Sequence, residues 1–275
     1  MSDEGHKQLL TKKQTMEKMI KSSLWALLLL VALTSCSKKD HPGSDPDDGD
    51  PAVGYIPVQD TKLTYTVTKG DEVGFSTVIT VDNFRDSASY TVVDFTIEAA
   101  GFVHHSRGAY SVQQSVTYND VPLLYVETVE NLIKPQYNSV FTHEEHPFIM
   151  TIPHQDQSGA TVLNETVVAV WHGVAIDPDE PHDETVADFS ITYHAGTIVG
   201  SEKVTTALGT FDCLKIVFNR TDFTKYSLNG EPLVDYKSEW EMTTWLVKGI
   251  GSVKSREVNL STGAISETEL TKIEK

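Results

Sequence analysis

The chain has 275 residues, with 22 Lys and Arg against 39 Asp and Glu, and a formal net charge of −17. This charge argues against nucleic-acid binding, because contacts to phosphates are made by Lys and Arg. It also argues against docking of the protein surface onto anionic lipid headgroups.

The first feature along the chain is a short apolar run, residues 24–33, which reads LWALLLLVAL. It is too short to span a bilayer as a helix, which needs about 20 apolar residues, and it suits the apolar centre of a secretory signal. The small residues Thr34 and Ser35 then precede Cys36. This pattern resembles the lipobox of bacterial lipoproteins, in which the cysteine after the cleavage site is acylated. We therefore predict a signal peptide over residues 1–35, lipidation of Cys36, and anchoring in the outer membrane through its acyl chains.

The segments on either side of this anchor are polar. A start at Met16 or Met19, in place of Met1, would give a leader of ordinary length. Residues 36–53 are dominated by Pro, Gly and Asp, so we predict a flexible tether there. The charged residues directly after Cys36 look like the surface-export signals of Bacteroidota lipoproteins. Tethers that face the periplasm are also polar, so both orientations remain open.

From residue 54 onward, apolar, β-branched and aromatic residues alternate with polar ones, which is the pattern of half-buried strands. Tight turns are indicated at Asn229-Gly230 and Thr262-Gly263. A short helix is expected only within residues 131–141, and a long loop over residues 177–184. We predict one all-β domain over residues 54–275, built as an antiparallel sheet, a barrel or a sandwich. Strands are expected at residues 62–68, 73–81, 87–97, 110–118, 121–129, 148–152, 162–171, 186–193, 197–206, 210–219, 238–247, 252–260 and 264–273.

Three segments near the C-terminus carry a resemblance. Residues 201–216 read SEKVTTALGTFDCLKI, residues 245–255 read WLVKGIGSVKS and residues 267–273 read ETELTKI. Their order resembles the end of a family of uncharacterised Bacteroidota lipoproteins, with a Gly-Thr-Phe turn and a later Gly-Ile-Gly turn. Gly249 and Gly251 suit that second turn, because glycine adopts positive φ freely. The resemblance implies a single large curved antiparallel sheet, a half-barrel similar to that of lipoprotein-localisation factors, and it implies no activity and no functional residue.

Two places could carry metal or thiol chemistry. Residues 143–146 read HEEH, and two histidines at this spacing can share a helix face and bind zinc. The HExxH pattern of hydrolytic zinc sites is absent, so a polar loop is the alternative that we adopt. Cys213 has no partner once Cys36 is acylated, so no internal disulfide is expected. We expect Cys213 to be a packed strand residue and not a reactive thiol.

Enzymatic activity has little support in the sequence. The G-x-S-x-G, P-loop and G-x-G-x-x-G patterns are all absent. Glycan hydrolysis needs two carboxylates across a cleft. Glu239 and Glu241 would share one sheet face, but a cross-strand charge row explains them equally well. Residues 86–88 (Asp-Ser-Ala) resemble the O-glycosylation acceptor motif of Bacteroidota, or else form a strand-entry turn. We predict no catalytic residues, no metal ligands and no cofactor.

These observations favour a lipid-anchored, non-enzymatic envelope protein that binds an apolar ligand or a protein partner on a concave sheet face. The alternative is a glycan-binding or glycan-hydrolysing surface lipoprotein of a nutrient-uptake system. A third possibility is a structural partner of another envelope protein. Membrane contact would be made through the anchor on Cys36, and no nucleic acid is expected. An apolar groove would favour lipid, exposed aromatic rings in a shallow cleft would favour sugar, and converging carboxylates would favour hydrolysis.

Overall fold

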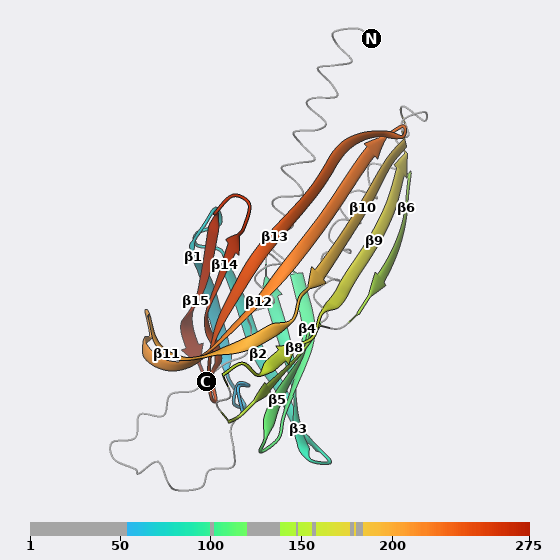
Figure 1. The fold of residues 1–275 in the computed structure, drawn as a ribbon. Helices are drawn as coiled ribbons and strands as arrows, with labels where there is room; N and C mark the ends of the chain where they lie inside the picture. Colours follow the sequence, from blue (N-terminus) through green and yellow to red (C-terminus); the bar gives the residue numbers. More distant parts are fainter. Residues whose placement is uncertain are drawn as a thin grey trace, which may run out of the picture.

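The computed structural model describes residues 54–99, 102–119, 138–146, 148–155, 158–176, 179 and 184–275. In these residues the regular structure is all strand, and all the strands belong to one antiparallel sheet (Figure 1). The predicted all-β class and single large antiparallel sheet are therefore confirmed. No helix able to cross a membrane occurs in this part of the chain. The strands are β1 Lys62–Lys69, β2 Ser76–Ser87, β3 Tyr90–Ala99, β4 Phe102–Tyr110, β5 Gln114–Asn119, β6 Asn138–Glu145, β7 Phe148–Pro153, β8 Thr161–Leu163, β9 Thr166–Ile176, β10 Glu184–Tyr193, β11 Gly196–Thr206, β12 Gly209–Leu228, β13 Glu231–Val247, β14 Gly251–Asn259 and β15 Ile265–Glu274.

The sheet is organised around β12, which is 20 residues long. One edge of β12 pairs with β13, while its other edge pairs first with β11 and then with β10. From β13 the sheet continues through β14, β15, β1, β2, β3, β4 and β5 to β7. β7 lies against β8, which pairs with β11. The sheet thus has an extended arm (β6, β9, β10 and the paired ends of β12 and β13) and a curled body made of the other strands (Figure 1).

Several expected element boundaries need correction. β4 was not predicted, because its sequence FVHHSRGAY lacks apolar alternation. The strand expected at residues 87–97 begins only at β3, after a two-residue turn in which Ala88 has a φ of 54°. The strand expected at residues 162–171 is divided between β8 and β9. The helix expected within residues 131–141 is wrong from Asn138 onward, where β6 begins. The leader, Cys36, the tether and the strand expected at residues 121–129 lie outside the described residues.

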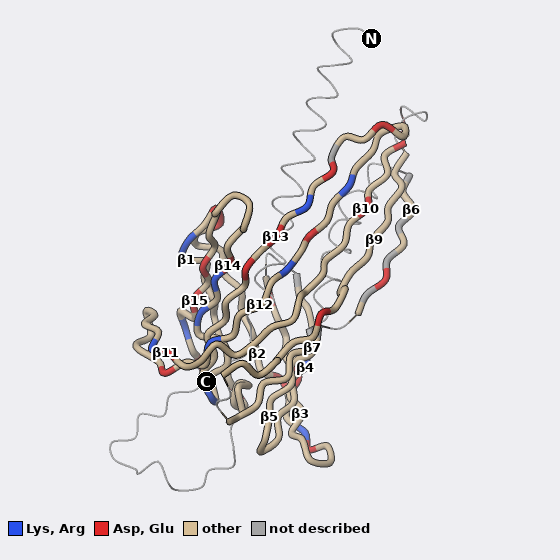
Figure 2. The backbone as a smooth tube through the Cα atoms, viewed as in Figure 1, with Lys and Arg blue, Asp and Glu red and all other residues tan. Residues whose placement is uncertain are grey.

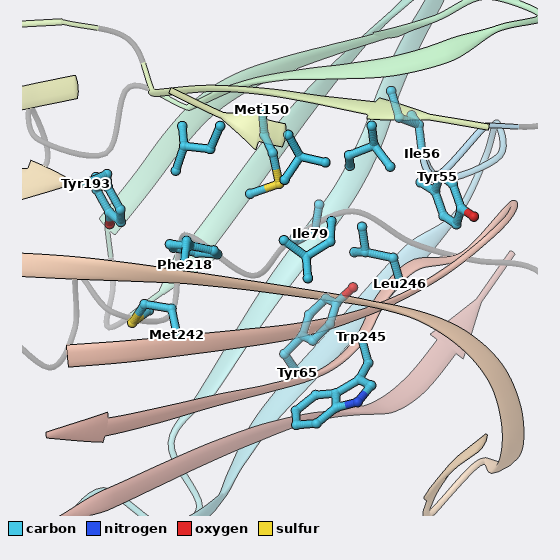
Figure 3. Packing of buried hydrophobic residues seen from close by; sticks show 14 of the residues in the cluster. Tyr55, Ile56, Tyr65, Ile79, Met150, Tyr193, Phe218, Met242, Trp245 and Leu246 are labelled. Atoms are coloured by element: carbon cyan, nitrogen blue, oxygen red, sulfur yellow. The ribbon is translucent and has the colours of Figure 1, made fainter. Parts of the chain in front are cut away.

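Apolar side chains fill the inner face of the body. Tyr65, Ile79, Met150 and Leu246 reach this space from β1, β2, β7 and β13 (Figure 3). Tyr55 and Ile56, from the segment that precedes β1, pack among them. Other members of the same cluster line the inner face of the arm. Because the described sheet has no helices beside it, it buries its apolar face by curling on itself.

The segment that enters the body, residues 54–56, is fastened by polar contacts. The backbone N–H of Gly249 donates to the Gly54 carbonyl at 2.8 Å, and the Tyr55 N–H donates to Ser115 Oγ at 2.8 Å. Ser115 Oγ also lies 2.9 Å from Nε2 of His154. A Cβ at Gly54 would collide with Ser115 Oγ. The entry segment is therefore held by strands distant from it in sequence.

Charged residues cover the outer face of the arm. His172, Asp188, Lys225 and Asp235 stand opposite one another on β9, β10, β12 and β13. Nδ1 of His172 lies 2.7 Å from Oδ1 of Asp188. Figure 2 shows charges of both signs along β12 and β13. Alternating cross-strand charges of this kind keep an exposed sheet face solvated.

We predict that Ile56→Ala lowers the free energy of unfolding by about 2–5 kcal/mol, because it leaves a cavity in a core position that is 1% exposed. Urea unfolding followed by tryptophan fluorescence measures the change. Val103→Ala is the matched control, since Val103 is 59% exposed on β4 and its truncation leaves no cavity. Equal effects of the two substitutions would show that the entry segment is not part of the core.

Candidate functional site

A groove of about 1150 Å³ crosses the body, mostly on the face opposite the core, although the core residue Phe95 also borders it. It runs over β2, β3, β4, β5 and β7, which are neighbours in the sheet. Most of the side chains around it carry a polar group, whereas its floor is apolar. The lining residues are Arg85, Ser87, Tyr90, Val92, Asp94, Phe95, His105, Ser106, Arg107, Ala109, Gln114, Val116, Tyr118, Ile149 and Thr151.

Strand register arranges these residues in rows, because opposite residues of an antiparallel pair point to the same face. The rows lie two residues apart along the strands, a spacing of about 7 Å. A charged row and an apolar row therefore lie side by side in the groove. Over β3, β4, β5 and β7 the charged row is Asp94, Arg107, Tyr118 and Ile149, and the apolar row is Val92, Ala109, Val116 and Thr151; on β2, Arg85 lies opposite Val92 at the end of the apolar row.

Asp94 connects two arginines at one side of the groove. Nε of Arg107 donates to Oδ1 of Asp94 at 2.9 Å. Arg85 contacts both oxygens of Asp94, through Nη1 and through Nη2, the latter at 3.3 Å. The hydrogen bond from Arg85, followed by that from Arg107, lowers the pKa of Asp94 although the carboxylate is partly buried. Asp94 is therefore ionised at neutral pH and orients both guanidinium groups.

Tyrosine side chains border the groove. Tyr118 lies opposite Arg107 and is 38% exposed. Gln114 Nε2 donates to the hydroxyl of Tyr90 at 2.6 Å, which fixes the tyrosine at the other end of the groove. His105 contributes Nδ1, 3.1 Å from Thr96 Oγ1. An exposed ring (Tyr118) and a half-buried one (Tyr90) beside fixed polar groups suit a ligand that has both an apolar face and hydrogen-bonding groups.

The groove is poorly suited to acid–base catalysis. Among the described residues that line it, Asp94 is the one carboxylate, and its lowered pKa makes it a weak proton donor. Retaining and inverting glycoside hydrolysis both need a second carboxylate across the scissile bond. The described lining of this groove therefore shows the features of a binding site and no carboxylate pair.

A second notable feature is a buried charged cluster, which we define as Arg220, Asp222 and Glu257. Arg220 and Asp222 are each 2% exposed and form a two-point ion pair, with Nε–Oδ1 at 2.8 Å and Nη2–Oδ2 at 2.9 Å. Trp240 lies opposite Arg220 on β13, with the guanidinium carbon 5.4 Å from the ring centroid. The ring and the carboxylate together stabilise this buried cation.

Glu257 is the unusual member of the buried charged cluster. It is 5% exposed, and its Oε2 has no hydrogen-bond partner among the described residues. Burial, only partly offset by the attraction of Arg220, raises the pKa of Glu257 to about 8. The carboxyl group is therefore mostly protonated at pH 7, which leaves the cluster close to neutral.

The structure tests three predictions that the sequence made for individual residues. Cys213 is buried and free, and burial raises its pKa to about 12, so it is a packed residue, as predicted, and not a reactive thiol. Residues 143–145 are the end of strand β6, so the shared helix face on which a zinc site would depend is absent, and the polar loop that we adopted there is wrong as well. No group of metal-binding side chains occurs among the described residues. Glu239 forms an ion pair at 2.6 Å with Lys237, two residues away on the same strand, whereas its cross-strand partner is Thr221 and that of Glu241 is Asn219, so the cross-strand charge row expected there is not formed.

The groove residues themselves were not identified from the sequence. Arg85, Asp94 and Arg107 come from three strands and show no common motif. Arg107 lies on β4, the strand whose sequence gave no period-two signal. Residues 86–88, considered as a glycosylation motif, form the β2–β3 hairpin at the edge of the groove, where Ser87 lines it. Only the strand register brings these positions together.

Comparison with known proteins identifies the fold. No protein-family model matches the sequence, and no curated protein matches it. A crystal structure of a candidate lipoprotein from Parabacteroides distasonis is similar, with a TM-score of 0.50 at 14% identity over 82% of this chain and 100% of that chain. A candidate exported protein with a YmcC-like fold from Bacteroides fragilis gives a TM-score of 0.48 at 15% identity, with the same coverage. The first likeness shows a shared fold, and at this identity it shows the fold alone.

We predict that Glu257→Gln flattens the dependence of stability on pH. The pKa of Glu257 is raised on folding, so its contribution to stability is fully present below the unfolded value near 4.5 and is lost as pH rises toward about 8. The native chain should lose stability between pH 5 and pH 8, whereas the variant, which cannot ionise at this position, should not. The melting temperature of the variant minus that of the native chain should therefore increase from pH 5 to pH 8. Differential scanning calorimetry at several pH values measures it.

Glu98→Gln, at an exposed position on β3, is the matched control for this experiment. It should shift the melting temperature by nearly the same amount at every pH. A constant difference between native chain and Glu257→Gln across pH 5–8 would show that Glu257 has an ordinary pKa in the folded protein.

Proposed function

We propose that this chain is a lipid-anchored cell-envelope protein that binds a ligand in the groove over β2–β5 and β7. The observation that carries the proposal is the groove itself, whose ion-paired arginines and ordered tyrosine converge above an apolar floor. Binding sites commonly combine apolar walls with a few oriented polar groups in this way. The lack of a second carboxylate in the described lining favours binding over hydrolysis.

This proposal changes the face on which the ligand binds. An apolar ligand on the concave inner face was the sequence-based expectation. That space in the body is occupied by side chains such as Ile56 and Met150. The outer groove, with exposed tyrosine beside charged groups, instead meets the criterion for a sugar-like ligand. The glycan-binding alternative is therefore the form of the proposal that we favour.

Anchoring through Cys36 is supported by the apolar run and the small residues that precede it. Cys36→Ser should abolish metabolic labelling with an alkyne fatty acid and release the protein from the membrane fraction. Cys213→Ala removes the other cysteine and should leave both properties unchanged. Membrane retention of Cys36→Ser with full labelling would contradict the anchor.

Native mass spectrometry of the protein, extracted from the membranes of the organism that encodes it, tests ligand binding. A co-purified ligand should be present, and Tyr118→Ala should lower the occupied fraction, since the loss of an aromatic contact worth about 1 kcal/mol raises the dissociation constant about fivefold. Tyr236→Ala is the matched control, because Tyr236 is an exposed tyrosine on the arm, outside the groove. If the two variants retain ligand equally, the groove is not the binding site.

A further inference from the structure

We infer that the ligand of the outer groove is an acidic saccharide whose carboxylate binds the guanidinium group of Arg107. This inference rests on the proposed function and names the class of ligand. Three observations carry it: the free edge of Arg107, the excess of positive charge in the groove, and the order of the rows.

Arg107 presents an unused hydrogen-bonding edge. Its Nε is held by Asp94 at 2.9 Å, while neither Nη atom has a hydrogen-bond partner within the described part of the chain. The side chain is 58% exposed, so this edge is open to solvent. A guanidinium group fixed at Nε still offers two parallel N–H donors, which match the two oxygens of a carboxylate.

The charges of the groove favour an anion. Arg85 and Arg107 contribute two positive charges, and Asp94 is the one acidic group among the described lining residues. This positive excess is local, because the chain as a whole has a formal net charge of −17. A neutral ligand would leave one guanidinium charge without a counter-charge, whereas a monoanionic group supplies it at short range.

The rows of the groove place a ring beside this anion site. Tyr118 lies opposite Arg107, and the apolar row begins about 7 Å further along the strands. This spacing is about the width of a pyranose ring, so a carboxylate on Arg107 would set the ring over Val116 and Tyr118. Gln114 and Thr151 line the adjoining part of the groove, where ring hydroxyls need partners. A fatty acid would leave these polar groups unpaired, which disfavours it.

The test uses the purified full chain and isothermal titration calorimetry. The probes are a panel of carboxylated oligosaccharides, including trigalacturonate, each beside its methyl ester, which keeps the ring and removes the charge. We expect at least one acid to bind, and its ester to bind about tenfold more weakly, the loss typical of one charge-assisted hydrogen-bond pair. Arg107→Gln should weaken the acid by a similar factor and leave the ester nearly unchanged. Lys225→Gln removes one positive charge from the arm and should change neither.

Asp94→Asn separates orientation from charge. This substitution makes the groove more positive and also removes the carboxylate that orients the guanidinium group of Arg107. Weaker binding of the acid would show that this orientation matters. Stronger binding would show simple charge attraction and would overturn the proposed role of the Arg107 geometry. The acidic-saccharide inference is also overturned if no acid in the panel binds, if acid and ester bind equally, or if acetate competes as well as the saccharide. The first two of these outcomes leave the proposed function standing wherever native mass spectrometry still detects a ligand that depends on Tyr118.

Discussion

The pairing of β12 with β13 is the constraint on which the rest of the structure depends. β13 follows one edge of β12 almost from end to end, while the other edge changes partner from β11, which pairs as far as Val217, to β10, which pairs from Arg220. That change divides the sheet into the body on the β11 side and the arm on the β10 side. The backbone bond from the His194 N–H to the Asn219 carbonyl, at 2.8 Å, closes the junction between the two partners. In the described residues a single long strand therefore belongs to both the body and the arm.

The buried charged cluster occupies this junction. Arg220 is the first residue of β12 paired with β10, and Asp222 follows it on the same face. An ion pair in this position is costly to desolvate, and its hydrogen bonds and the Trp240 ring offset that cost only in one arrangement of the strands. Slippage of β12 by one residue would turn both charges to the opposite face. The cluster thus disfavours other registers at the point where β12 changes partner. No disulfide helps to fix the register in the described residues, because Cys213 is unpaired.

The strand pattern of the C-terminal half was predictable because each strand there alternates clearly, as at residues 186–193 and 210–219, and because Asn229-Gly230 adopts the positive φ values of a tight hairpin turn. β4 was not, since its inward positions hold His104, Ser106 and Gly108 in place of large apolar side chains, and Ile56 packs against Gly108. The groove could not be predicted because it depends on β4. The row of Asp94, Arg107 and Tyr118 is set by the register of β3, β4 and β5, and that register cannot be assigned when the middle strand has no apolar alternation.

The groove and the core are two sides of the same strands, and this gives the groove its rigidity. On β3, Val93 and Phe95 are buried in the core, while Asp94 between them holds both arginines. On β5, Ser115 fastens the entry segment from behind, while its neighbours Gln114 and Val116 line the groove. A side chain whose backbone is held by the core on one face loses little further freedom when a ligand binds on the other. The entry segment, residues 54–56, is therefore packed directly behind the strands that form the binding groove. The contacts that hold this segment also help to keep the strands of Arg107 and Tyr118 in position.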